Sequence, residues 1–228
     1  MSSVESYQTS VVDGPGDVPE PEHEDDALPS DDAAPEVGLI PAVDPSSVPP
    51  DEGDAGPEDA LDAARATSVS GLSATNRIRA RDLACQAALL TIRHAPEIHY
   101  TQEARARWEG ITKDLKAYRG QYPSYADCSS MATWWLWQGL DHYGVRDVVN
   151  DTGWRSGYTG TMLSHGRQVV NRGNWLRGDL LIYGSGFPGK HVVMYLGDGF
   201  VASHGSEPGP FKVRWNYRSD LMQVRRYI

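Results

Sequence analysis

Charge is distributed unevenly along this chain of 228 residues, and this limits which part can fold. Residues 1–64 contain 18 Asp or Glu, no Lys or Arg, 10 of the 15 prolines and a single aromatic residue, Tyr7. Such a segment buries too little apolar surface to offset its chain entropy. We therefore expect a disordered acidic tail over residues 1–66. It serves either as a solubilising spacer or as an autoinhibitory or targeting segment that lies against the rest of the chain.

Residues 67–228 are enough for one folded domain with a sizeable core, which we expect to be a monomer. After residue 64 the chain has 13 acidic and 21 basic residues, a formal charge of +8. This excess favours an anionic partner, either nucleic acid or a bacterial wall polymer. The arginines are scattered and no nucleic-acid motif is present, so nucleic acid has little support. No apolar run has membrane-spanning length, and no secretory signal is recognisable.

The pattern of this domain predicts helices first and strands after. We expect helices over residues 74–94 (capped by Ser73), 102–118 and 127–143. Strands are expected over 180–183, 191–196, 200–204, 212–217 and 222–227, and the irregular stretch 144–177 is expected to form a functional loop beside a cleft. Helices followed by an antiparallel sheet predict an α+β fold.

Two cysteines, Cys85 and Cys128, are too few and too far apart for a disulfide framework or a zinc site. We therefore expect a reduced compartment at synthesis, no metal and no cofactor. Cys85 falls within the apolar pattern of the first helix and is expected to be a small buried side chain.

Cys128 stands at the expected start of the third helix, with polar neighbours on both sides. Asp127 is a good N-cap residue, which places Cys128 and Ser129 in the first turn. Unpaired N–H groups and the helix dipole would lower the pKa of the thiol there, and the same groups would hold an oxyanion. Cys128 is therefore a candidate nucleophile, with Asp127 and Ser129 beside the oxyanion. The alternative is a buried structural cysteine.

A nucleophilic cysteine needs a base, and the base needs an orienting partner. His191 begins an expected strand, and Asp198-Gly199 turns the chain into the next one. A two-residue turn would place His204 on the face of His191, diagonal to it. A three-residue turn would turn His204 away and put Ser203 on that face. We expect the two-residue turn, and hence His204 as the orienting residue.

Three ordered stretches resemble the signatures of the NlpC-type cysteine peptidases. They are Asp127-Cys128-Ser129-Ser130, Gly178-Asp179-Leu180-Leu181-Ile182-Tyr183 and the run from His191 to Gly199. The resemblance covers roughly residues 75–228 and implies a papain-like fold that cleaves peptide stems of bacterial peptidoglycan. It also implies that Cys128 is the nucleophile and His191 the general base, and that the third polar residue falls at or near His204.

The stretch from residue 99 to the end is also similar to the peptidase module of lysins from phages of actinobacteria. The similarity lies at Trp108, at residues 153–154 and 157–161, and at residues 203–210. Tyr100 matches the family tyrosine that lines the cleft, although its separation from Cys128 is longer than usual. Two glycines of the family pattern are replaced here, by Ser130 and by Val193, and the latter is expected to narrow the cleft.

The resemblance implies an endopeptidase that acts on peptidoglycan as a lysin or a virion component. We expect synthesis in the host cytoplasm without a signal peptide, and then holin-dependent release or packaging in the virion. Three alternatives stay open: an N-acetylmuramoyl-alanine amidase with the same Cys and His, a non-catalytic protein that binds the wall or belongs to the virion, and a nucleic-acid binder.

Overall fold

The computed structural model describes residues 69–112, 114–145, 149–150 and 156–228. The acidic tail predicted over residues 1–66 lies outside them. The helices are α2 (Ala74–Arg93), α3 (Ala104–Gly110), α4 (Cys128–Leu140) and α5 (Thr159–Ser164). Short 3-10 turns are η2 (Val69–Gly71), η3 (Ala95–Glu97), η4 (Ala117–Arg119), η5 (Asp141–Tyr143), η6 (Arg172–Asn174) and η7 (Trp215–Tyr217).

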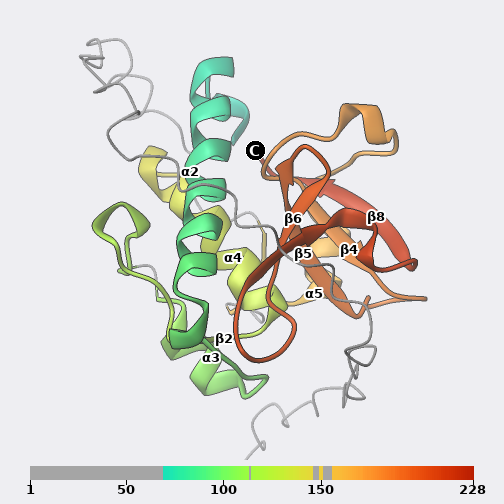
Figure 1. Ribbon diagram of the computed structural model, residues 1–228. Coiled ribbons are helices and arrows are strands. Elements are labelled where there is room, and N and C mark those ends of the chain that lie inside the picture. Colours follow the sequence, from blue (N-terminus) through green and yellow to red (C-terminus); the bar gives the residue numbers. More distant parts are fainter. Residues whose placement is uncertain (1–68, 113, 146–148, 151–155) are drawn as a thin grey trace, which may run out of the picture. The chain divides into compact units, whose positions relative to one another are not determined.

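Six strands form one antiparallel sheet in the order β3-β8-β4-β5-β6-β7. They are β3 (Arg167–Gln168), β4 (Leu180–Tyr183), β5 (His191–Gly197), β6 (Phe200–Ser203), β7 (Phe211–Arg214) and β8 (Leu221–Arg226). A separate parallel pair joins β1 (His99–Tyr100) to β2 (Tyr125–Ala126). Helices precede the sheet, and α4 packs against both α2 and β5 (Figure 1). The predicted α+β arrangement, helices first and an antiparallel sheet after, is confirmed.

Helix α2 begins as predicted, because the Ser73 hydroxyl accepts a hydrogen bond from the Asn76 N–H at 3.1 Å. Its buried face consists mostly of alanines with Cys85, while Ile78 is exposed. Small side chains allow α4 to approach closely: a Cβ on Gly139 of α4 would lie 2.2 Å from the Ala80 carbonyl oxygen. Only glycine fits at that crossing. Cys85 is fully buried, as predicted.

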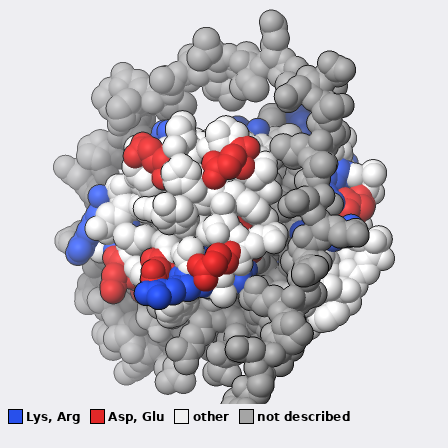
Figure 2. Space-filling view, turned by 90° about the horizontal axis from the view of Figure 1, so that it is seen from below, with Lys and Arg blue, Asp and Glu red and all other residues white. Residues whose placement is uncertain are grey.

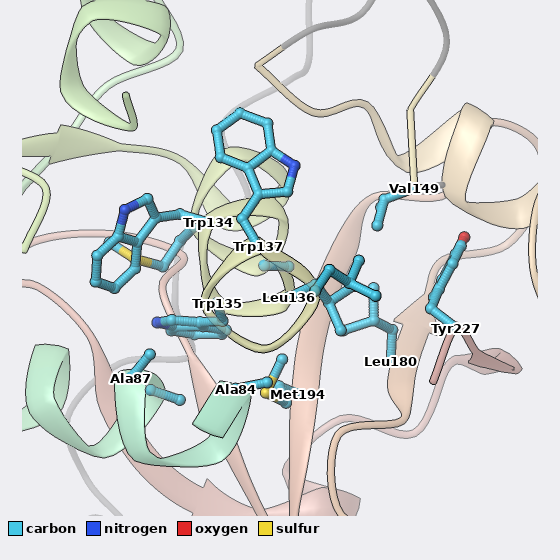
Figure 3. Packing of buried hydrophobic residues seen from close by; sticks show 14 of the residues in the cluster. Ala84, Ala87, Trp134, Trp135, Leu136, Trp137, Val149, Leu180, Met194 and Tyr227 are labelled. Atoms are coloured by element: carbon cyan, nitrogen blue, oxygen red, sulfur yellow. The ribbon is translucent and has the colours of Figure 1, made fainter. Parts of the chain in front are cut away.

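Helix α4 is buried on all sides and forms the centre of the core. Trp135 extends toward α2, where its indole N–H donates to the Thr91 hydroxyl at 3.1 Å. Leu136 extends toward Leu180 on the opposite side, in the sheet (Figure 3). Complete burial of a leucine contributes roughly 1.5–3 kcal/mol relative to exposure. A helix apolar all round is stable only between two layers, and this fixes the position of its N-terminal cysteine.

Two sequence predictions were wrong in part. The helix expected over residues 102–118 ends at Gly110, and a 3-10 turn follows at 117–119. Ile111 turns into the core there and is fully buried, so tertiary packing outweighs local helix propensity. The strand expected over 212–217 ends at Arg214, and η7 follows it. Within the stretch 144–177, the structure describes α5, β3 and η6 in addition to irregular chain.

None of the helices in the described ranges is both long enough and apolar enough to cross a membrane.

Candidate active site

The Cys128 position is defined by the cap of α4. The Asp127 carboxylate accepts from the Ser130 N–H at 2.7 Å, and the Asp127 N–H donates to the Ser130 hydroxyl at 2.7 Å. This reciprocal capping box uses Ser130, the residue that replaces the family glycine. The Ser129 hydroxyl also donates to the carboxylate, at 3.0 Å. Cys128 therefore occupies the first position of a firmly capped helix.

A buried ion pair holds the same cap from outside the helix. The Arg107 guanidinium of α3 donates to the second oxygen of Asp127 at 2.7 Å, and both side chains are nearly inaccessible. Asp127 was predicted beside the oxyanion, but its two oxygens are engaged by Arg107, Ser129 and Ser130. Its role in the structure is to cap and anchor. Arg107 lay within a predicted helix, where no spacing rule marked it as a partner of Asp127.

The Cys128 sulfur lies against backbone N–H groups from two elements. Hydrogen bonds from Val192 and Ser129 favour the thiolate, and Arg107 does so at longer range. Burial outweighs them, and the Asp127 charge adds to burial, so the pKa of the thiol rises to about 12. The sequence predicted a lowered pKa. That direction is wrong because the helix start lies inside the protein, where Cys128 is only 8% exposed.

His191 lies at the start of β5, directly before the residue whose N–H meets the Cys128 sulfur. Its Nε2 is 2.9 Å from the Ser203 hydroxyl oxygen. In the described part of the chain its Nδ1 has no hydrogen-bond partner, and no hydrogen bond joins the ring to the Cys128 sulfur. Burial is the main cause of the lowered pKa of His191, about 3, and the Arg218 charge adds to it. The imidazole is therefore neutral at rest.

The pairing of β5 with β6 decides which residue meets His191. Gly197 pairs with Phe200 across the expected two-residue turn, but Tyr195 pairs with Val201, so Leu196 is an extra residue. This bulge shifts the register by one position. The prediction that His204 orients His191 is therefore wrong. Ser203, the residue that a three-residue turn would have given, occupies that place.

His204 is fully buried on the other side of the strand. Its Nε2 is 3.0 Å from the Ala126 carbonyl oxygen, two residues before Cys128. Its ring meets Tyr100 edge-on at 5.5 Å between centroids. His204 thus links the end of β6 to β2, the strand that leads into the cysteine.

Tyr100, expected to line the cleft, lies on β1, where its ring contacts His204. It pairs with Ala126 in the parallel β1-β2 pair, and its hydroxyl accepts from the Gln102 amide at 3.0 Å. Burial and the negative charge of a Cys128 thiolate raise the pKa of Tyr100, so the phenol stays protonated. Its backbone N–H donates to the Glu207 carboxylate at 2.8 Å.

The β6-β7 connection, residues 204–210, crosses the site from the sheet to β1. Glu207 binds Tyr100 there, and a Cβ on Gly205 would lie 3.0 Å from Cε1 of His191. A Cβ on Gly209 would overlap the Ala95 carbonyl oxygen, at 2.1 Å. At Gly205 and Gly209 the connection runs too close to His191 and Ala95 for a larger side chain. It therefore limits the position of the His191 ring at its Cε1 edge.

Two further features bear on the sequence predictions. Val193, expected to narrow a cleft, is fully buried in a core cluster with Leu181 and Val201. Within the described ranges, no group of three or more His, Cys, Asp or Glu is arranged to hold a metal ion.

Charged side chains on one face of the molecule are interspersed among uncharged ones (Figure 2). The visible Lys and Arg side chains on this face do not form a single patch. This face therefore gives no support for a nucleic-acid surface, which would need clustered basic residues.

No protein-family model matches the chain, and no curated protein matches it. Several solved structures are similar at low identity. NlpC1 from Trichomonas vaginalis is 16% identical with a TM-score of 0.43, over 63% of this chain and 44% of that chain. The peptidoglycan hydrolase RipB from Mycobacterium tuberculosis is 19% identical with a TM-score of 0.47, over 70% of each chain.

The P60 domain of an antigen from M. avium subspecies paratuberculosis is 22% identical with a TM-score of 0.42, over 65% of this chain and 97% of that domain. This chain spans less than half of the length of the Trichomonas vaginalis protein. At such identities and TM-scores, the function has to be inferred from the geometry of the site itself.

Proposed function

We propose that this chain is a peptidoglycan hydrolase that cuts amide bonds of the peptide stem by cysteine-histidine chemistry. One observation carries the proposal: the fold brings the Cys128 sulfur and His191, which are far apart in the sequence, to adjacent positions. The sulfur lies against the N–H of the residue after His191, and Ser203 holds the far nitrogen of the ring. A structural cysteine needs neither neighbour. The three ordered motifs, which resemble NlpC-type peptidases, supply the substrate class.

The first chemical step is acyl transfer. With Nε2 of His191 held by Ser203, Nδ1 is the nitrogen left to take the Cys128 proton. The thiolate attacks the amide carbonyl, and a tetrahedral oxyanion forms. The N–H group of Cys128 donates to no protein acceptor in the described part of the chain, so it is available to hold this oxyanion.

The second step releases both products. The protonated His191 gives its proton to the leaving amine, the C–N bond breaks, and a Cys128 thioester remains. Water, deprotonated by Nδ1 of His191, then attacks the thioester and restores the thiol. The neutral resting pair fits this sequence, since the proton moves from Cys128 to His191 only as the thiol attacks.

Replacement of the nucleophile tests the proposal, with the second cysteine as a matched control. Cys128→Ala should abolish the loss of turbidity of purified cell walls, while Cys85→Ala should retain it, because Cys85 is buried in α2 away from the site. Circular dichroism of both variants checks folding. Wall hydrolysis by folded Cys128→Ala would refute the proposal.

The bond cut and the biological setting are finer parts of the same proposal. Similarity to lysins of actinobacteriophages supports cleavage within the peptide stem, at the bacterial cell wall, by a phage lysin or a virion-associated lysin. Mass spectrometry of soluble digestion products should show new free amino groups on stem residues. Fragments that carry an intact stem freed from its sugar would instead identify an amidase.

A further inference from the structure

We propose that Tyr217 is a positioning residue that accepts the hydroxyl proton of Ser203, so that His191 carries its N–H on Nε2 and leaves Nδ1 free to take the Cys128 proton. The inference rests on the proposed function, in which His191 takes the Cys128 proton. It concerns a residue that no sequence motif marked, at the end of η7.

The three side chains form one hydrogen-bonded chain. The Ser203 hydroxyl oxygen lies 2.9 Å from His191 Nε2 and 3.4 Å from the Tyr217 hydroxyl oxygen. Ser203 is fully buried, and no third partner of its hydroxyl is present in the described part of the chain. The proton of Ser203 therefore has two destinations, the imidazole or the phenol.

Proton counting decides between them during catalysis. A neutral imidazole carries one N–H, and Nδ1 can accept the thiol proton only when that N–H is on Nε2. Nε2 therefore donates to Ser203 both before and after Nδ1 takes the thiol proton. The Ser203 proton then has to point at the Tyr217 oxygen, and the phenol turns its own hydrogen away by rotation about its C–O bond. Without that acceptor, a buried hydroxyl proton would be unpaired while the positive charge exists.

Carboxylates do not perform this task at the site. The charges of Asp127 and, to a smaller extent, Asp220 favour protonated His191. The Asp127 carboxylate is bound by Arg107 and Ser130, and that of Asp220 by the Arg218 guanidinium through two hydrogen bonds at 3.0 and 2.9 Å. In the described ranges no carboxylate is hydrogen-bonded to His191. The hydrogen bond of the ring at Nε2 therefore depends on two hydroxyl groups in series.

Tyr217 is itself held in place by the sheet. The Tyr183 hydroxyl of β4 donates to the Trp215 carbonyl in the same 3-10 turn. The Tyr217 ring also meets Tyr183 and His191 edge-on, at 5.8 and 6.5 Å between centroids. Tyr217→Phe keeps these ring contacts and removes only the oxygen, so it isolates the proposed role.

The test measures alkylation of Cys128 by iodoacetamide at neutral pH, located by peptide mass spectrometry. This rate follows the population of the thiolate-imidazolium pair and needs no wall substrate. We expect Tyr217→Phe to lower the rate about tenfold, as loss of a buried hydrogen-bond partner does. On soluble wall fragments, kcat should fall by the same factor with KM unchanged.

A double-variant cycle separates this role from a structural one. Ser203→Ala removes the proton in question, so Tyr217→Phe should have no further effect in that background. In Ser203→Thr, which keeps a hydroxyl, the tenfold effect should return. Additive effects in the Ser203→Ala background, or an unchanged alkylation rate in Tyr217→Phe, would overturn the inference. If wild type is alkylated rapidly but leaves wall fragments intact, the proposed function is rejected, while the hydrogen-bonded chain of His191, Ser203 and Tyr217 is still supported.

Discussion

Burial sets the resting protonation states of the two central residues. Removal from water disfavours both the thiolate and the imidazolium, which raises the pKa of Cys128 to about 12 and lowers that of His191 to about 3. The pair therefore holds one shared proton over the whole physiological range. Cys128 and His191 are therefore both uncharged at rest, and charge develops on them only as the thiol attacks.

This protonation state predicts a flat pH profile. Between pH 5 and 9 neither His191 nor Cys128 titrates, so kcat/KM on a soluble stem peptide should vary by less than about twofold. Initial rates at constant ionic strength measure it. An acid limb near pH 6.5 would contradict the account, because it would show that His191 titrates at its ordinary pKa.

The same shift predicts a stability change in acid. The pKa of His191 is lowered on folding, so its contribution is present above pH 6.5 and is lost as the pH falls toward 3. Between pH 7 and 5 this amounts to about 2 kcal/mol. In urea unfolding, wild type should lose about that much more stability over this interval than His191→Gln, which cannot titrate. Equal losses in both proteins would contradict the shift.

At the scale of elements, one bulged hairpin and one tight connection assemble the site. The bulge in β5 turns Ser203 toward His191, and residues 204–210 run past the imidazole to β1. The hairpin and its two-residue turn followed from Asp198-Gly199, since both residues adopt the positive φ that such turns need. The bulge did not, because nothing local distinguishes an extra residue in a strand from a paired one.

Gly205 tests the tight connection. Gly205→Ala should push the imidazole by a few tenths of an ångström, because the new Cβ would lie 3.0 Å from Cε1 of His191. We expect kcat to fall about tenfold from misplacement of the base. Gly186→Ala is the control, since its Cβ meets nothing within 4 Å. A Gly205→Ala enzyme with wild-type kcat would show that the ring position is not set here.

Arg107 tests the junction of α3 with α4. Arg107→Ala would leave the buried Asp127 carboxylate without its cation, at a cost of about 3–5 kcal/mol of stability. Arg105→Ala in the same helix removes an exposed pair with Glu109, which solvent screens, and should change stability far less. Chemical denaturation compares the two. Similar losses would mean that the Arg107 pair does not anchor the start of α4.

At the scale of the whole molecule, the sequence predicted the layers and the elements that carry Cys128 and His191, but not all of the partners of these residues. Helix and strand periodicity gave the α+β order, and the N-cap signal placed Cys128 at a helix start. Contacts between distant segments carry no local signal, so Arg107 and Tyr217 were not predicted. The pKa direction of Cys128 was missed for the same reason, since burial depends on the complete fold.

The central claim is that Cys128 forms a covalent acyl-enzyme. The most direct measurement is intact-protein mass spectrometry after an acid quench during turnover of soluble wall fragments, followed by peptide mapping. The account predicts a mass increase equal to the acyl part of the cleaved stem, carried by Cys128 and absent from Cys128→Ala. Product formation without any such adduct, or an adduct on another residue, would contradict it.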